Sequence, residues 1–181
     1  MSPSAAPTTI WTIGHSTRRI EEFLSLLAES RIEVIADVRS FPASRKYPQY
    51  GKEALATTLA AHSIGYDWYP ALGGRRQVLP GSPNTAWRNA SFRGYADYMS
   101  SPEFAQGLGQ LIQRASQART AIMCAEAVWW RCHRSMIADA LSVRDIEVVH
   151  ILDAKHHVVH PMTSPARVVG GTLTYVADLR E

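Results

Sequence analysis

The stretch IWTIGHSTRRIEEFLSLL, residues 10–27, decides how this chain is expected to fold. Its first four residues form a short apolar run typical of a buried strand, and Gly14 ends that run. The apolar residues that follow recur with the spacing of one helix face: Ile20, Phe23, Leu24 and Leu27. Ser16 or Thr17 is expected to cap this helix. The stretch therefore predicts a strand followed by a helix.

The same order of a short apolar run and a helical pattern recurs along the chain. Further strands are expected at 32–38, 66–69, 120–124 and 146–152, and further helices at 52–62, 92–99, 102–117 and 134–143. This alternation predicts an α/β fold, a single domain with a mostly parallel sheet flanked by helices. Residues 157–160 and 172–176 add a C-terminal hairpin or edge strands. We expect one domain over residues 10–181 and a flexible N-terminal tail over residues 1–9.

Composition limits the classes of protein that the chain can belong to. With 46% apolar and 19% charged residues in a length of 181, it has enough apolar side chains to fill a core and is not typical of a disordered chain. The net charge of +3 makes an anionic small molecule or a nucleic acid a more natural partner than a cation. No membrane span or signal peptide is recognised, so we expect a cytoplasmic protein. Its two cysteines suit reduced thiols there.

Polar or glycine residues lie at the end of four of the expected strands or beyond it, where the ligand crevice of a parallel sheet lies. They are His15 for the first strand, Asp37 and Arg39 for the second, Gly73 and Gly74 for the third, and Cys124 and Glu126 for the fourth. We predict that they line one cleft. Each also has a simpler interpretation: His15 as a turn cap, Asp37 with Arg39 as a structural ion pair, and the glycines as a tight turn. The irregular segment 73–90 is a long loop of the kind that often serves function.

The segment 124–134 is the densest in reactive side chains. Cys132, His133 and Arg134 would open a helix, whose free N–H groups favour an anion and lower the pKa of a thiol. We predict that Cys124 is a nucleophile with a depressed pKa, and that Arg134 holds a phosphate or carboxylate through two hydrogen bonds. The alternatives are a buried, inert cysteine and a structural ion pair between Arg134 and Glu126 or Asp37. Too few ligands cluster for a typical structural zinc site, and we expect no metal and no cofactor.

The motifs together resemble the family called domain of unknown function 488. They are TIGHST (12–17), DVRSFPASR (37–45), LGG (72–74), CAE (124–126), CHR (132–134) and HI (150–151). The resemblance implies a small bacterial or archaeal α/β protein. The signature residues that it implies are His15, Asp37, Arg39, Arg45, Cys124, Glu126, Cys132, His133 and Arg134.

Three functions compete on these observations. The leading hypothesis is an enzyme that acts on a phosphate-bearing substrate, a nucleotide or nucleic acid, with Cys124, Glu126 and His15 as catalytic residues. The expected anion-binding residues are Asp37, Arg39, Arg45, Gly73, Gly74, Cys132, His133 and Arg134. One alternative is a non-enzymatic nucleic-acid-binding or adaptor module that uses the basic loop and the tryptophans at 129 and 130. The other is a redox or metal-binding protein that uses Cys124, Cys132 and His133.

Overall fold

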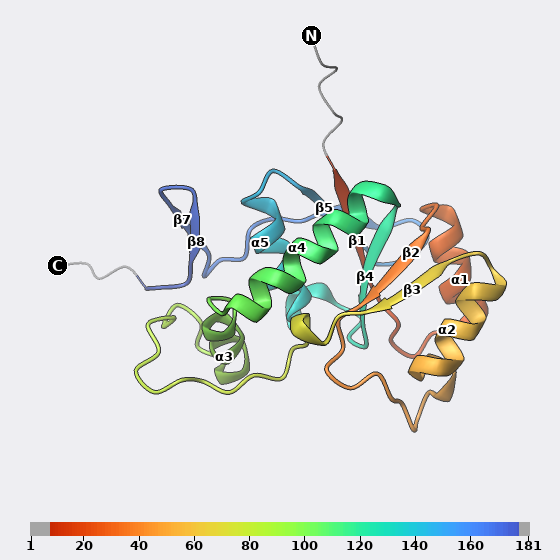
Figure 1. Ribbon diagram of the computed structural model, residues 1–181, viewed down its shortest axis with the longest axis horizontal. Coiled ribbons are helices and arrows are strands. Elements are labelled where there is room, and N and C mark those ends of the chain that lie inside the picture. The colour runs from red at the N-terminus through yellow and green to blue at the C-terminus, as the bar shows by residue number, and fades with distance from the viewer. Residues whose placement is uncertain (1–7, 178–181) are drawn as a thin grey trace, which may run out of the picture.

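A computed structural model describes residues 8–177 and contains a six-stranded central sheet (Figure 1). The strand order is β3-β2-β4-β1-β5-β6; the first five of these strands are parallel and β6 is antiparallel to β5. The bounds are β1 Thr9–Gly14, β2 Val34–Asp37, β3 Gly65–Trp68, β4 Thr120–Cys124, β5 Glu147–Ile151 and β6 His157–Val159. A separate two-stranded sheet pairs β7, Arg167–Val169, with β8, Thr172–Thr174. The predicted single α/β domain with a mostly parallel sheet is confirmed.

Helices cover both faces of the sheet. In Figure 1, α1 (Ile20–Glu29) and α2 (Lys52–Ala61) lie on one side, and α4 (Pro102–Gln117) and α5 (Arg134–Ser142) lie on the other. The helix α3, Ala90–Tyr98, precedes α4, and three short 3₁₀ turns complete the structure: η1 Pro48–Tyr50, η2 Pro70–Leu72 and η3 Trp129–Arg131. The inner strands β2, β4 and β1 therefore have both faces covered and are mostly buried, which explains their nearly continuous apolar runs.

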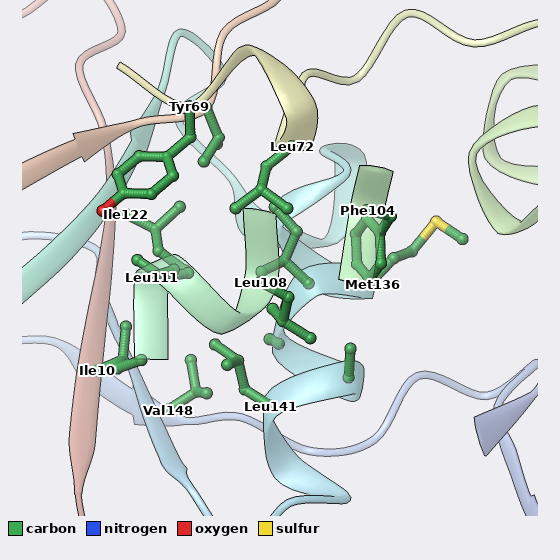
Figure 2. Packing of buried hydrophobic residues seen from close by; sticks show 14 of the residues in the cluster. Ile10, Tyr69, Leu72, Phe104, Leu108, Leu111, Ile122, Met136, Leu141 and Val148 are labelled. Carbon is green, nitrogen blue, oxygen red and sulfur yellow. The ribbon is translucent and has the colours of Figure 1, made fainter. Parts of the chain in front are cut away.

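Alternation along the strands divides the core into two clusters. Ile10 and Ile122 point to the α4 and α5 side, whereas Ile13 and Met123 pack with α1 and α2. Figure 2 shows the first cluster, in which helix residues such as Leu108 lie against strand residues. Because successive side chains of a strand face opposite ways, position parity decides the cluster to which each strand residue belongs.

The chain leaves the neighbouring strands β1 and β4 toward opposite faces. After β1 it continues into α1, and after β4 it continues through η3 into α5. Such a divergence opens a crevice beyond the carboxyl ends of the two strands. The ladder extends slightly into it, since the His15 amide donates to the Cys124 carbonyl oxygen at 2.9 Å and the Ser16 amide to that of Ala125 at 3.0 Å. The topology thus provides the place for a site.

Two details of the sequence prediction are wrong. Neither Ser16 nor Thr17 caps α1: the residue before the helix is Arg19, which makes no side-chain capping bond, and Ser16 adopts a left-handed backbone with φ 51°. The segments 157–160 and 172–176 do not pair with each other either. The first forms the sheet edge beside β5, and the second pairs with β7 in a hairpin that Figure 1 shows far from α1 and α2. The expected tail lies mostly in residues 1–7, outside the described part, while Thr9 already belongs to β1.

The long loop between η2 and α3 is held in place by a buried carboxylate. Asp97 of α3 accepts hydrogen bonds from the Leu79 amide at 2.9 Å, the Ser82 hydroxyl at 2.5 Å and the Asn84 side-chain amide at 2.7 Å. The loop is therefore fixed against α3, and its first residues are positioned at the crevice. No helix in the described part of the chain is long and apolar enough to cross a bilayer.

Gly14, at the end of β1, lies against the segment that follows β4. A Cβ atom added there would come 1.8 Å from the carbonyl oxygen of Glu126 and 3.0 Å from the Cα atom of Ala127. We expect Gly14→Ala to lower the free energy of unfolding by about 3 kcal/mol or more, because backbone cannot yield as a flexible side chain can. Denaturant melts measure this change.

Gly109 of α4 is the matched control for that substitution. Gly109 is also a glycine within a regular element, here a helix, but an added Cβ atom would meet nothing within 4 Å. Gly109→Ala should therefore raise the free energy of unfolding by roughly 0.8–1.0 kcal/mol. Equal effects of the two substitutions would contradict the close approach at Gly14.

Candidate active site with a paired cysteine centre

A cleft of about 790 Å³ lies beyond the carboxyl ends of β1, β2 and β4. Most of the residues predicted from sequence line it: His15, Arg39, Gly74, Cys124, Glu126, Cys132 and His133. Four do not line it: Asp37, Gly73 and Arg134, which are buried, and Arg45, which is exposed. The strand-end argument therefore finds the place of the cleft but not the depth of each side chain.

Two cysteines meet at the inner wall of the cleft. The sulfur atoms of Cys124, which ends β4, and Cys132, which precedes α5, lie 2.9 Å apart, and both residues are less than a tenth exposed. The Cys124 thiol also lies 3.7 Å from the carbonyl oxygen of Glu126. The backbone N–H of Arg134 points to the Cys132 sulfur at 3.4 Å. The two thiols are therefore joined by a hydrogen bond.

His133 connects this pair to the opposite wall. Its Nε2 lies 2.9 Å from the carbonyl oxygen of Val38, which only accepts hydrogen bonds, so Nε2 carries a proton. Its Nδ1 then faces the Cys132 sulfur at 3.5 Å. Gly74 permits this position, because a Cβ atom there would come 2.5 Å from Nδ1. The ring is oriented to take or give a proton at Cys132.

Arg39 and Asp37 form a buried ion pair under one wall. The guanidinium donates from Nε to Oδ1 at 2.9 Å and from a terminal nitrogen to Oδ2 at 2.7 Å, and the Tyr66 hydroxyl donates to the same Oδ2 at 2.5 Å. The pair corresponds to the structural interpretation of these residues. Arg39 reaches the cleft only through the remaining part of its surface, since it is 7% exposed.

His15 lies in the wall as a neutral ring. Its Nδ1 lies 2.9 Å from the Ser16 carbonyl oxygen, and the ring stacks on Tyr50 at 4.2 Å between centroids. Burial, with a smaller contribution from the charge of Arg39, lowers the pKa of His15 to about 4. The Ser16 carbonyl requires a proton on Nδ1, so Nε2 is the unprotonated nitrogen.

Arg134 lies beneath the cleft and is only 1% exposed. Its terminal nitrogens donate to the Thr12 hydroxyl at 3.1 Å and to the carbonyl oxygen of Glu126 at 2.6 Å, and no carboxylate within residues 8–177 pairs with it. The expected ion pair with Glu126 or Asp37 is therefore absent from residues 8–177, and Arg134 does not line the cleft. The exposed Glu126 side chain lies at the rim of the cleft.

Two arginines that the sequence analysis did not assign to the site line the cleft instead. Arg75, at the start of the long loop, and Arg131, directly before Cys132, are both exposed. The Arg75 guanidinium lies 5.4 Å from the centre of the Phe41 ring, which is 67% exposed. Their positions in the sequence could have indicated this, because Arg75 directly follows the glycine pair and Arg131 directly precedes Cys132.

A sequence model of the family described as Domain of unknown function DUF488 matches residues 19–141, which is more than half of the chain. The chain belongs to the DUF488 family. Comparison with curated proteins and with solved structures gave no match. Within the matched residues lie the Asp37–Arg39 pair and the two cysteines with His133 and Arg134, while His15 lies just before them.

The pKa values of the two thiols of this DUF488 protein are shifted in opposite directions. Burial raises the pKa of Cys124 well above its ordinary value, and its hydrogen bond to Cys132 adds to the effect. Burial acts in the same direction on Cys132, but the hydrogen bond from Cys124 and the charges of His133 and Arg134 hold its pKa well below the ordinary value. The prediction of a depressed pKa for Cys124 is therefore wrong: the lowered pKa belongs to its neighbour Cys132.

No group of three or more His, Cys, Asp or Glu side chains between residues 8 and 177 is arranged to hold a metal ion. The nearest approach to one in the DUF488 cleft is the set that the sequence suggested, Cys124, Cys132 and His133.

The acidity difference predicts how single cysteine variants react. In Cys124→Ser the serine hydroxyl can still donate to Cys132, so alkylation by iodoacetamide should stay fast below pH 7. In Cys132→Ser the remaining thiol should react slowly until the pH exceeds about 8.5, the pKa of an unperturbed cysteine. Alkylation rate against pH, with thiolate absorbance as a second measure, decides it. A normal pKa in Cys124→Ser would contradict the assignment.

Proposed function

We propose that this DUF488 protein is an enzyme in which the Cys132 thiolate attacks a phosphate-bearing substrate, a nucleotide or nucleic acid, held in the cleft. The observation that carries the proposal is the Cys132 sulfur, which faces the cleft between a thiol donor at 2.9 Å and an imidazole nitrogen at 3.5 Å. A thiolate with an adjacent base is the arrangement of cysteine nucleophiles in general.

Charge at the cleft supports an anionic substrate. Arg75 and Arg131, which are far apart in the sequence, are both exposed and both line the cleft. Glu126 is the one carboxylate among the lining residues in the described part of the chain. Arginine binds phosphate through paired hydrogen bonds. Phosphate binding is thus assigned to these two residues, and Arg134 and Arg45, which the sequence suggested for it, are not used.

Aromatic side chains on the same walls support a base-bearing substrate. Phe41, Tyr47 and Phe92 line the cleft, and Phe41 presents two thirds of its surface to solvent. An exposed ring beside an arginine is suited to stacking on a nucleobase, and such stacking contributes about 1–3 kcal/mol per base. Substrates with both a phosphate and a base match the cleft better than a bare anion.

The chemical step follows from the two polar neighbours of Cys132. In the resting pair the His133 Nδ1 holds the proton of Cys132, and a lone pair of the Cys132 thiolate forms a bond to the attacked atom of the substrate. The bond to the leaving group breaks, and the leaving group receives the proton from His133. Water then attacks the same atom, gives a proton to the neutral His133, and displaces the sulfur as a thiolate. Cys124 serves as the hydrogen-bond donor that stabilises the thiolate before and after the attack.

Binding measurements on arginine variants test the substrate class. Calorimetric titration with nucleoside monophosphates, a short single-stranded oligonucleotide and inorganic phosphate identifies the ligand that binds. Arg75→Ala and Arg131→Ala should each weaken that binding about tenfold or more, because a hydrogen bond to a charged group contributes about 1.5–3 kcal/mol. Arg31, exposed where the chain enters β2 at the opposite end of the sheet, is the matched control, and Arg31→Ala should leave the affinity unchanged.

Three outcomes would count against this function. No binding of any of these probes would remove the phosphate-bearing substrate. Equal loss in all three arginine variants would point to net charge rather than to the cleft. Tight binding without any turnover that depends on Cys132 would leave a nucleic-acid-binding module in place of an enzyme.

A thiol redox function is the second candidate, favoured by the 2.9 Å between the two sulfur atoms. A hydroperoxide would transfer one oxygen to the Cys132 thiolate, giving an alcohol or water and a sulfenic acid. The Cys124 thiol would then attack that sulfur, form a disulfide and release water. A dithiol would reduce the disulfide again. Either function needs reduced thiols, so we place the protein in the cytoplasm.

Oxidation by one equivalent of hydrogen peroxide separates the two candidates. A redox protein should form the Cys124–Cys132 disulfide faster than an ordinary thiol oxidises, and dithiothreitol should restore it. In Cys124→Ser the sulfenic acid has no partner and should be trapped by dimedone. Slow oxidation, with mass gains of oxygen atoms and no disulfide, would eliminate the redox function and leave the hydrolytic one.

A further inference from the structure

A line of buried polar side chains runs from Arg134 away from the cleft to the far side of α5. The Thr12 hydroxyl, which accepts from Arg134 at 3.1 Å, lies 2.6 Å from Nδ1 of His150. The Nε2 of His150 lies 2.8 Å from Nδ1 of His160, and Nε2 of His160 lies 2.8 Å from Oδ1 of Asp139. All of these residues are buried, and they come from β1, β5, the end of β6 and α5.

We assign the direction of each hydrogen bond in this line by taking both imidazole rings as neutral, with the charged groups at the two ends fixing the first donor and the last acceptor. A guanidinium only donates, so the Thr12 oxygen accepts from Arg134, and with a neutral His150 protonated at Nε2 the Thr12 proton is assigned to the hydrogen bond with Nδ1 of His150. His150 then donates from Nε2 to His160, which donates from Nε2 to the Asp139 carboxylate. This arrangement satisfies every position with both imidazoles neutral. Burial, with a smaller contribution from the charge of Arg134, agrees with a neutral His150 by lowering the pKa of His150 to about 2.

Each end of the line carries a full charge that is otherwise incompletely matched. Asp139 is an anion that accepts three further hydrogen bonds, from the amide and hydroxyl of Thr163 and from the hydroxyl of Tyr175. At the other end, the Nε of Arg134 has no hydrogen-bond partner in residues 8–177, and the groups that raise its pKa are the thiols of Cys124 and Cys132. We call the hydrogen-bonded residues Thr12, His150, His160 and Asp139 the relay. The guanidinium therefore lies between this relay and the thiol pair.

We propose that Thr12, His150, His160 and Asp139 are positioning residues that hold the Arg134 guanidinium against the thiol pair and so maintain the Cys132 thiolate. The proposal rests on the proposed function only in taking Cys132 as the reacting group. Every donor in the relay points toward Asp139, so its negative charge makes the Thr12 oxygen a stronger acceptor for Arg134. Held on this side and by the Glu126 carbonyl on the other, Arg134 keeps one orientation beneath the sulfurs.

Trp129 packs against both histidines of the relay. Its ring stacks on His150 at 4.5 Å with an angle of 3° between the planes, and it meets the edge of His160 at 5.2 Å. Trp129 therefore has a packing role, while the neighbouring Trp130 is 52% exposed. A dry relay transmits the charge of Asp139 more strongly than a hydrated one, because the local dielectric constant is low.

Substitution of Thr12 tests the relay at its narrowest point. Thr12→Val removes the hydroxyl and keeps the shape, and Thr12→Ser keeps the hydroxyl. We expect Thr12→Val to raise the pKa of Cys132 by about one unit, which reduces its thiolate and its alkylation rate about tenfold at pH values below that pKa. Thr12→Ser should restore the rate to near that of the unaltered protein. Alkylation rate against pH gives the pKa.

Thr120→Val is the matched control for loss of a buried strand hydroxyl. Thr120 is as buried as Thr12, but its hydroxyl donates at 3.0 Å to the Ala118 carbonyl, outside the relay. It should lower the melting temperature without moving the pKa of Cys132. An unchanged pKa in a folded Thr12→Val would overturn the proposal. An ordinary pKa of Cys132 in the unaltered protein would instead refute the proposed function.

A measurement on the unaltered protein covers the case in which Thr12→Val does not fold. Nitrogen-15 NMR of labelled histidine should show His150 and His160 both neutral and protonated at Nε2, and their signals should move when Cys132 is alkylated. Protonation at Nδ1 of either ring would reverse the relay and contradict the proposal. Signals that do not respond to alkylation would show that the relay is not coupled to the thiolate.

Discussion

A guanidinium enclosed without a carboxylate is the constraint on which the rest of this site depends. Arg134 is almost fully buried and stays charged at any ordinary pH, and its hydrogen-bond acceptors in the described chain are a hydroxyl and carbonyl oxygens. Carbonyl oxygens carry partial charges only, and a buried full charge without an anion costs several kcal/mol. The sulfurs of Cys124 and Cys132 are the adjacent groups that can supply one. The need to neutralise Arg134 thereby becomes a driving force for ionising Cys132.

The fold brings this arrangement together from segments that are distant in sequence. β1 and β4 are neighbours in the sheet, and the absence of a side chain on Gly14 allows the segment after β4 to lie on the end of β1. The carbonyl oxygen of Glu126 then reaches Arg134, while the Cys124 sulfur reaches Cys132. Since the same short segment supplies both contacts, a shift of its backbone would disturb the acidity of the thiol as well as the packing.

The sequence predicted the sheet and the position of the cleft because both follow from simple periodicities. Parallel strands end at one edge, so residues directly after them, such as His15 and Cys124, had to meet there. How deeply each side chain is buried was harder to predict from the sequence. Arg134 shares a helix face with Ile137, Ala138 and Leu141, three, four and seven positions on, and this spacing marks it as buried, a signal that the charge of the side chain obscured. Which thiol is more acidic depends on His133 and Arg134 in three dimensions, and spacing alone does not contain that information.

A thiol is a different counter-ion from a carboxylate, and the difference suits catalysis. A carboxylate beside Arg134 would remain ionised throughout and would have no further chemistry to offer. A thiolate loses its charge when it forms a covalent bond, which leaves the buried guanidinium without its anion. On the proposed mechanism, the covalent intermediate at Cys132 is therefore destabilised relative to the free thiolate. The same interaction that lowers the pKa makes this sulfur a better leaving group, because a more acidic thiol departs faster. Burying Arg134 without a carboxylate thus favours the release of product, and it supports the attack only by increasing the fraction of Cys132 that is ionised.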